Sequence, residues 1–141
     1  MYDRQYAADL PPVTVVAVEI EQVLLNLLKN AAHAMRANPP GRPPRLQLRA
    51  YARGAYAVLE VEDNGSGMDE EVRRRAFEPF FTTKGPGLGT GLGLSVSYKI
   101  ITQNHKGLME VWSRPEQGAR FILHLPLERP EPQNLQGGGN G

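Results

Sequence analysis

The feature that most constrains this chain is a glycine repeat from Gly85 to Gly93, in which every second residue is glycine. Because glycine has no Cβ, consecutive backbone N–H groups can turn toward one anion and approach it closely. The segment from Leu94 to Ile101 contains no glycine or proline, so the repeat leads into a helix N-terminus, which favours phosphate. The repeat therefore predicts a phosphate-binding loop. A disordered linker is the alternative, although leucines alternate with these glycines and are rare in linkers.

The repeat fits neither common phosphate-loop motif. A nucleotide-triphosphatase loop needs a lysine directly after its glycines, whereas the only neighbouring lysine, Lys84, precedes them. The dinucleotide motif needs a glycine three residues after its second one, and none stands there. A phosphate site here therefore implies another fold.

Length, charge and composition exclude several classes of protein. The 141 residues, 40% of them hydrophobic, fit one domain over residues 1–127 with a polar, glycine-rich tail over 128–141. The net charge of +1 gives no reason to expect nucleic acid or direct membrane contact. There is no cysteine and no apolar run near about eighteen residues, so disulfides and a membrane span are not expected. We expect a cytoplasmic domain.

Hydrophobic periodicity predicts three helices and about five strands. The helices are predicted over residues 18–36, 70–76 and 92–103, and Asp69 is expected to cap the second. The strands are predicted within 2–15 and over 46–51, 56–62, 108–113 and 119–125, with 46–51 and 56–62 forming a hairpin.

The long first helix carries two stripes of different chemistry. Its predicted core face is Ile20, Leu24, Leu27, Leu28, Ala31 and Met35, and its opposite stripe is Glu19, Gln22, Asn26, Asn30 and His33. Asparagine is a middling helix former, so a pair at i and i+4 calls for an explanation. We interpret Asn30 as an oxygen ligand for a magnesium ion that substrate phosphates complete, with Asn26 positioning water or the same ion. A solvated polar face is the alternative.

Two further segments have both an ordinary and a functional interpretation. Residues 63–68, Asp-Asn-Gly-Ser-Gly-Met, are either a simple turn or a purine pocket in which Asp63 accepts a hydrogen bond from an exocyclic amine. Gly65 and Gly67 would then let the backbone pass close to a flat base. The aromatic residues of segment 77–84 either pack in the core or hinge a lid, from which Lys84 reaches a terminal phosphate.

In their order and spacing, four segments resemble the motifs of the ATP-binding catalytic domain of sensor histidine kinases: residues 22–31, 63–68, 77–84 and 89–94. This domain belongs to the family of gyrase, heat-shock chaperone, histidine kinase and mismatch-repair ATPases. The resemblance covers about residues 10–127. It implies an α+β fold of the Bergerat type, a two-layer α/β sandwich. Its mixed sheet of about five strands is backed by three main helices, and a glycine-rich lid covers ATP.

The resemblance also implies roles for individual residues. Asn30 would ligate Mg²⁺ with support from Asn26, Asp63 would recognise adenine, and Lys84 would contact the terminal phosphate. These three, Asn26, Asn30 and Lys84, are the catalytic residues it implies. The implied ATP-binding residues are Asn26, Asn30, His33, Asp63, Gly65, Gly67, Met68, Phe80, Thr83, Lys84, Gly89, Thr90, Gly91, Leu92, Gly93 and Leu94.

Several positions depart from the family pattern. Hydrolytic relatives place a glutamate at the position of Asn26, and an amide cannot act as a general base, so transfer to a protein is favoured over hydrolysis. Val16 stands where relatives commonly start the helix with aspartate, which leaves that start uncertain by a residue or two. Lys106 and Ala119 replace a frequent glycine and a threonine. These three changes affect capping or packing.

The chain contains no credible phosphoacceptor histidine. In the kinases the acceptor is followed by an acidic residue, whereas His33, His105 and His124 are followed by alanine, lysine and leucine. We therefore expect a monomeric catalytic fragment of a homodimeric kinase, membrane-anchored or not. Its partners would be the parent's dimerisation domain, which supplies the histidine, and a downstream response regulator. A nucleotide-binding regulatory module and an ATP hydrolase are the alternatives.

Overall fold

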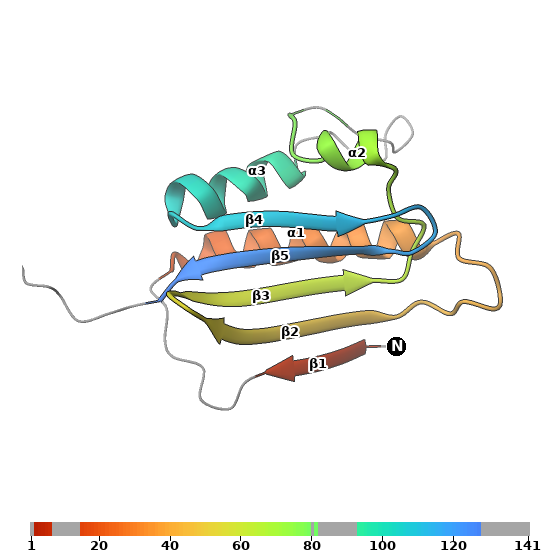
Figure 1. Cartoon of the computed structure of the whole chain (residues 1–141), viewed down its shortest axis with the longest axis horizontal. Helices are drawn as coiled ribbons and strands as arrows, with labels where there is room; N and C mark the ends of the chain where they lie inside the picture. The colour runs from red at the N-terminus through yellow and green to blue at the C-terminus, as the bar shows by residue number, and fades with distance from the viewer. Residues whose placement is uncertain (1, 7–14, 80, 82–92, 128–141) are drawn as a thin grey trace, which may run out of the picture.

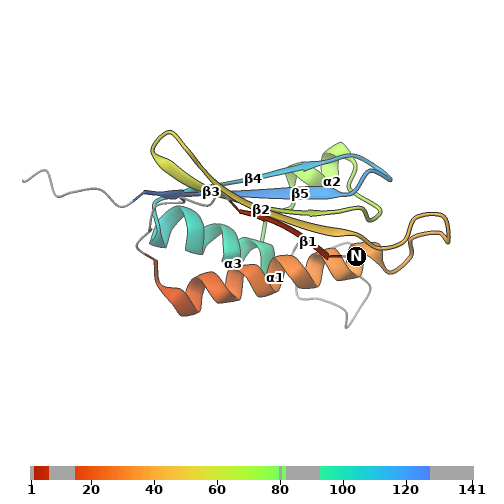
Figure 2. The ribbon, with the colours of Figure 1, turned by 90° about the horizontal axis from the view of Figure 1, so that it is seen from below.

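The computed structural model describes residues 2–6, 15–79, 81 and 93–127. These residues form two layers, a five-stranded sheet and a layer of helices against one of its faces (Figures 1 and 2). The predicted tail and the greater part of the glycine repeat lie outside the described residues.

The sheet is mixed, as predicted. Its strands are β1 (Tyr2–Tyr6), β2 (Leu46–Arg53), β3 (Tyr56–Asp63), β4 (Leu108–Ser113) and β5 (Ala119–Pro126). They lie in the order β1-β2-β3-β5-β4, with β1 parallel to β2 and the other neighbours antiparallel. The β2–β3 pair is the predicted hairpin, and β5 lies between β3 and β4.

Strand alternation directs one set of side chains toward the helices. On β5, Ala119, Phe121, Leu123 and Leu125 are buried, while the residues between them are only partly buried. This period of two is the pattern of a strand with one covered face. The buried β5 side chains form the centre of the core together with residues of β3, β4 and the helices.

Helix α1 (Ala17–Met35) lies along the sheet beside α3 (Gly93–Lys99), so that two helices form the second layer (Figure 2). The buried residues of α1 are Val23, Leu27 and Ala31. The predicted core face omitted Val23, which is 0% exposed, whereas the predicted Ile20, Leu24 and Leu28 are partly buried and pack against the core. A helix that packs on both a sheet and a neighbouring helix buries a wider arc than one stripe.

The start of α1 has an unusual partner. The N-cap residue Val16 is extended and provides no side-chain cap. Its backbone N–H donates instead to His105 Nε2 at 2.9 Å, and His105 Nδ1 lies 3.0 Å from the Ile100 carbonyl oxygen. Since Nε2 accepts, the ring proton is on Nδ1 and is donated to Ile100. The His105 ring thus joins the start of α1 to the end of the helical segment that runs from Ile100 to Asn104.

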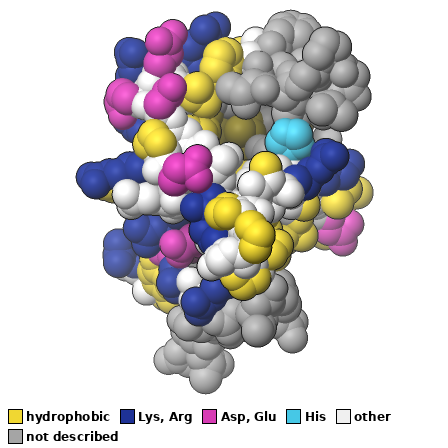
Figure 3. Space-filling model, turned by 90° about the vertical axis from the view of Figure 1, so that its right-hand side faces the viewer, with side chains coloured by type: hydrophobic (Ala, Val, Ile, Leu, Met, Phe, Trp, Pro, Cys, Tyr) yellow, Lys and Arg dark blue, Asp and Glu magenta, His cyan; other side chains and the backbone are white. Residues whose placement is uncertain are grey.

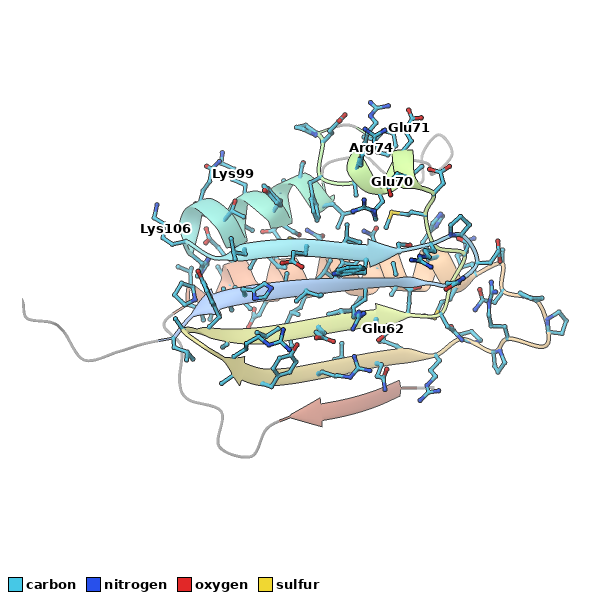
Figure 4. The ribbon with its side chains drawn as sticks, viewed as in Figure 1. Glu62, Glu70, Glu71, Arg74, Lys99 and Lys106 are labelled. Carbon is cyan, nitrogen blue, oxygen red and sulfur yellow. The ribbon has the colours of Figure 1, made fainter. Side chains whose placement is uncertain are left out.

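The two remaining helical segments also agree with the sequence. Helix α2 (Glu70–Arg74) is capped by Asp69, whose Oδ1 accepts the Val72 N–H at 2.9 Å, although the helix ends two residues earlier than predicted. Helix α3 continues into a π-helical turn, η1 (Ile100–Asn104). Helix α2 lies beyond the β4 edge, and its Glu71 and Arg74 side chains stand on the side of the helix away from β4 (Figure 4). The predicted α+β sandwich with three helices is confirmed.

Since Leu59 and Val61 of β3 pack in the core, Glu60 between them faces the other side of the sheet, where it pairs with Arg49 and Arg120. Glu62 lies on the same strand (Figure 4). Glu60 is only 6% exposed. It accepts a short hydrogen bond from the Tyr51 hydroxyl and pairs with Arg49 Nη1 at 2.8 Å. Burial alone would raise the pKa of Glu60, but these two partners and Arg120 outweigh burial, so its pKa is lowered.

Among the helices of the described residues, none is both long and apolar enough to cross a bilayer.

Candidate nucleotide site

The loop that follows β3 meets the end of α1, where the Ser66 N–H donates to the Ala34 carbonyl at 3.1 Å. Seen from this end, the surface is hollowed and apolar side chains form the floor of the hollow (Figure 3). Asp63 is the last residue of β3, and its side chain lies on the same side of the strand as Val61, toward the helices. The segment from Asn64 to Met68 follows it without regular secondary structure.

Asp63 is a buried carboxylic acid, 6% exposed. Its Oδ1 accepts the Gly65 N–H at 2.8 Å. Burial raises the pKa of Asp63, and hydrogen bonds from the backbone of Gly65 and Ala119 only partly oppose that shift. A buried carboxyl that keeps its backbone donors is held in one orientation, as recognition of a base edge requires.

The two glycines after Asp63 are needed for close packing of backbone on backbone. A Cβ on Gly65 would stand 2.5 Å from the Ala34 carbonyl oxygen of α1. Gly67 has a φ of +71°, and a Cβ there would overlap the Arg114 carbonyl oxygen. The sequence suggested that these glycines let a base approach closely. The structure shows that they allow the backbone at Ala34 and at Arg114 to lie close to the loop.

The β4–β5 turn holds this glycine loop in place through hydrogen bonds. Gly118 N–H donates to the Gly65 carbonyl at 3.1 Å, and Glu116 N–H donates to the Ser66 carbonyl at 2.6 Å. The Ser113 hydroxyl accepts the Met68 N–H at 2.8 Å and donates to the Gly118 carbonyl at 2.7 Å. The loop is thus fixed between α1 on one side and the turn on the other.

The asparagine stripe of α1 is partly buried in the structure. Asn26, Asn30 and His33 are all half-buried. The Asn26 Nδ2 lies 3.2 Å from both the Gly93 carbonyl oxygen and the Ser97 hydroxyl oxygen of α3. Asn26 therefore does not belong to a solvated polar face, because it contacts the neighbouring helix.

Two aromatic residues of the segment before the glycine repeat, Phe77 and Phe81, are described and both are partly buried. Phe77 stacks on Tyr98 of α3, with ring centroids 4.8 Å apart, and meets Phe121 edge-on at 6.4 Å. Phe81 lies under the Arg75 guanidinium at 4.3 Å. Core packing therefore accounts for Phe77.

Part of the predicted lid can be located. Gly93 is the first residue of α3, and the partly buried Leu94 packs against the core. The predicted ATP-binding residues Phe80, Thr83, Lys84, Gly89, Thr90, Gly91 and Leu92 lie outside the described residues.

A family model described as histidine kinase-, DNA gyrase B-, and HSP90-like ATPase matches residues 15–129. The chain belongs to this ATPase family. The match spans α1 through β5, so it includes the asparagines of α1 and the loop that follows Asp63.

Relatives of this ATPase domain are sensor kinases. The two-component sensor PprA of Pseudomonas aeruginosa is 44% identical over 116 residues, which cover 81% of this chain and 12% of PprA. The signal transduction histidine-protein kinase AtoS of Escherichia coli is 42% identical over 119 residues, which cover 84% of this chain and 18% of AtoS. The chain thus spans less than one fifth of the length of these two relatives.

Solved structures agree with the fold. The catalytic domain of histidine kinase ThkA matches with a TM-score of 0.75 at 30% identity, covering 89% of this chain and 79% of that domain. ThkA in complex with the response regulator protein TrrA matches with a TM-score of 0.71 at 28% identity, covering 90% of this chain and 34% of ThkA.

The oxygen atoms that α1 offers would suit a magnesium ion whose remaining ligands come from a nucleotide. Among the described residues, no group of three or more His, Cys, Asp or Glu side chains could hold a metal ion. Magnesium prefers oxygen ligands, keeps several waters and is commonly completed by substrate phosphates. The carboxamide oxygens of α1 are therefore a chemically suitable but incomplete set, which a triphosphate would complete.

Sequence reasoning missed two serines of this domain. Ser97, 0% exposed, and Ser113 each hydrogen-bond a predicted site residue or its loop. A serine among Leu94, Val96 and Ile100 on a short helix is a signal for Ser97, because a buried hydroxyl needs a partner. Ser113 ends an ordinary strand, and its partners come from a turn and a loop, so no local pattern indicates it.

Proposed function

We propose that this ATPase domain binds Mg·ATP and transfers the γ-phosphoryl group to a histidine on a separate dimerisation domain of a two-component sensor kinase. The observation that supports the proposal is the buried Asp63 carboxyl, held by backbone donors at the end of β3, where the following loop packs on Ala34 near the end of α1. Its orientation is suited to accepting a hydrogen bond from an exocyclic amine.

The other residues would act by positioning. The Asn30 carboxamide oxygen would hold Mg²⁺, which when bound neutralises charge on the phosphates. His33 and Lys84 would contact phosphate, and Gly65, Gly67 and Met68 would line the base pocket. The glycine-rich segment with Phe80, Thr83 and residues 89–94 would enclose the nucleotide. Phosphoryl transfer requires little covalent help from a protein, so positioning and charge neutralisation suffice.

The absence of a base at position 26 supports transfer over hydrolysis. An amide cannot accept a proton from water at neutral pH, so Asn26 would not activate water as an acid at this position could. Transfer to an imidazole needs no such base, because the neutral ring nitrogen is already a nucleophile.

The test is to mix the chain with the dimerisation domain of its parent kinase and γ-labelled ATP, with Mg²⁺ or with EDTA. Acid-labile, base-stable label on the dimerisation domain that requires Mg²⁺ is the expected result. Tight ATP binding without label would indicate a regulatory binding module. Sustained phosphate release by the chain alone would indicate a hydrolase. A response regulator added afterwards should remove the label, if the parent is a two-component kinase.

A further inference from the structure

The side chain of Asn26 links the two helices that border the proposed site. Its Nδ2 lies 3.2 Å from the carbonyl oxygen of Gly93 and 3.2 Å from the hydroxyl oxygen of Ser97. Gly93 begins α3, and Ser97 lies one turn further along the same helix. One carboxamide of α1 thus holds the first turn of α3 at two points.

The chemistry of this link requires a donor at position 26. The Gly93 carbonyl oxygen can only accept a hydrogen bond, and a carboxamide offers two N–H groups. A carboxylate has no donor, so aspartate or glutamate at this position would face the carbonyl oxygen with like partial charge. The amide at position 26 therefore has a structural task that an acid cannot perform.

Burial makes Ser97 a specific partner. Its side chain is 0% exposed, whereas Gly93 and Tyr98 on the same helix are exposed. A buried hydroxyl that lost its partner would be destabilising, so the serine is tolerated because Asn26 reaches it. Alanine at this position would keep the helix and remove only the bond to α1.

We propose that Asn26 and Ser97 form a positioning pair that fixes α3 against α1. The pair sets the spacing between Asn30 and the first turn of α3, and with it the width of the proposed nucleotide site. This inference rests on the proposed ATP-binding function. It gives Asn26 a role through α3, in contrast to the direct support of magnesium that the family resemblance implies.

The experiment is a double-mutant cycle on the 141-residue chain. Calorimetry measures the Kd of ATP with Mg²⁺ and with EDTA for the wild type, Ser97→Ala, Asn26→Asp and the double variant. Thr102→Val is the matched control, because the Thr102 hydroxyl donates within its own helix to the Tyr98 carbonyl at 2.7 Å and not to α1. Amide hydrogen exchange over residues 93–101 is measured without ligand.

We expect Ser97→Ala to weaken ATP binding about three- to tenfold, the usual effect of losing one hydrogen bond. The factor should be the same with and without Mg²⁺, because the pair acts through α3 and not on the metal. Asn26→Asp should weaken binding further, and the double variant should bind no more weakly than Asn26→Asp alone. Exchange over 93–101 should accelerate in all three variants and not in Thr102→Val.

Two results would overturn the positioning pair. One is a Ser97→Ala variant that binds ATP as tightly as the wild type and has unchanged exchange over 93–101. The other is an Asn26→Asp variant whose entire loss disappears in EDTA, which would make Asn26 a metal-site residue. If the wild type bound no ATP, the proposed function would fail, while the exchange measurement would still decide whether the pair holds α3.

Discussion

The carbonyl oxygen of Ala34, near the end of α1, lies 2.5 Å from the point where a Cβ on Gly65 would stand. Because the obstacle is backbone and not a flexible side chain, Gly65→Ala should destabilise the fold by about 1–3 kcal/mol. Gly41→Ala is the control, since no atom lies within 4 Å of its Cβ position. Urea unfolding of both variants measures the difference. Equal stability of the two would contradict the close packing of the Asp63 loop on α1.

Replacing Asp63 should change which base is preferred. An asparagine side chain would present an N–H₂ group as well as an acceptor, so the Asp63→Asn variant should lose about tenfold or more of the preference for ATP over GTP. Competition binding with the two nucleotides measures this ratio. Asp69→Asn removes the same negative charge at the exposed N-cap of α2, so this variant should keep the wild-type ratio of ATP to GTP affinity. An unaltered ratio in Asp63→Asn would remove this carboxyl from base recognition.

A new charge at Asn30 should disturb the nucleotide complex. Asn30→Asp would place a negative charge beside the triphosphate, so Mg·ATP should bind about tenfold or more weakly. Gln103→Glu adds the same charge at an exposed position on η1 and serves as the control. Calorimetry in Mg²⁺ provides the comparison. If Asn30→Asp bound as tightly as Gln103→Glu, Asn30 would have no part in the site.

The cluster around Glu60 should make stability depend on pH at the acid end. The pKa of Glu60 is lowered from its ordinary 4.5, so the charged form stabilises the native state above that pH. This stabilisation is lost as the pH falls through the lowered pKa, where the native carboxylate takes up its proton. Glu60→Gln should therefore cost about 1–3 kcal/mol at pH 7 and progressively less in acid.

Urea unfolding at pH 7 and at several values below the ordinary pKa of 4.5 tests this dependence. Glu62→Gln, next but one on β3 and more exposed, should have a smaller effect at every pH. A Glu60→Gln penalty that stayed constant into acid would mean that the charge of Glu60 does not stabilise the fold.

The uncapped start of α1 offers a stabilising change. Val16 is half-exposed, extended and without a side-chain cap, so Val16→Asp should accept a first-turn N–H and raise stability by about 0.5–2 kcal/mol. Val16→Ala separates this gain from the loss of an exposed apolar group. The midpoint of thermal unfolding should rise for aspartate only. No rise would mean that aspartate at this position does not accept a first-turn N–H, since the bond between Val16 and His105 uses only the N–H of Val16 itself.

Local patterns predicted most of the secondary structure. The helical period of α1, the β2–β3 hairpin and the Asp69 cap all depend on near neighbours, and each was found within two residues or so of its predicted bounds. Val23 was missed because it is buried in a core that is completed by residues of η1, β4 and β5, more than seventy residues further along the chain. Patterns of one helix do not reveal the packing of a second.

The candidate site likewise contains residues that the local sequence indicated and contacts that it could not indicate. Asn26 and Asn30 stood out because asparagine is a middling helix former, whereas Asp63 was a candidate because it stands at a strand end before two glycines. Ser113 and the Ala34 carbonyl could not be predicted, because they meet the Asp63 loop only after the sheet and α1 have assembled. The backbone role of Gly65 likewise depends on an atom 31 positions earlier in the numbering.

The position of β5 has a consequence for biosynthesis. This strand is made after β3 and β4 yet lies between them, so β4 has no partner strand and β3 has only β2 until β5, which ends at Pro126, has left the ribosome. The same strand begins beside Asp63, and its preceding turn holds the glycine loop. A nascent chain that stops short of β5 would therefore leave the β5-facing borders of β3 and β4 unpaired and prone to pairing with other polypeptides, and Asp63 would lack its neighbouring strand.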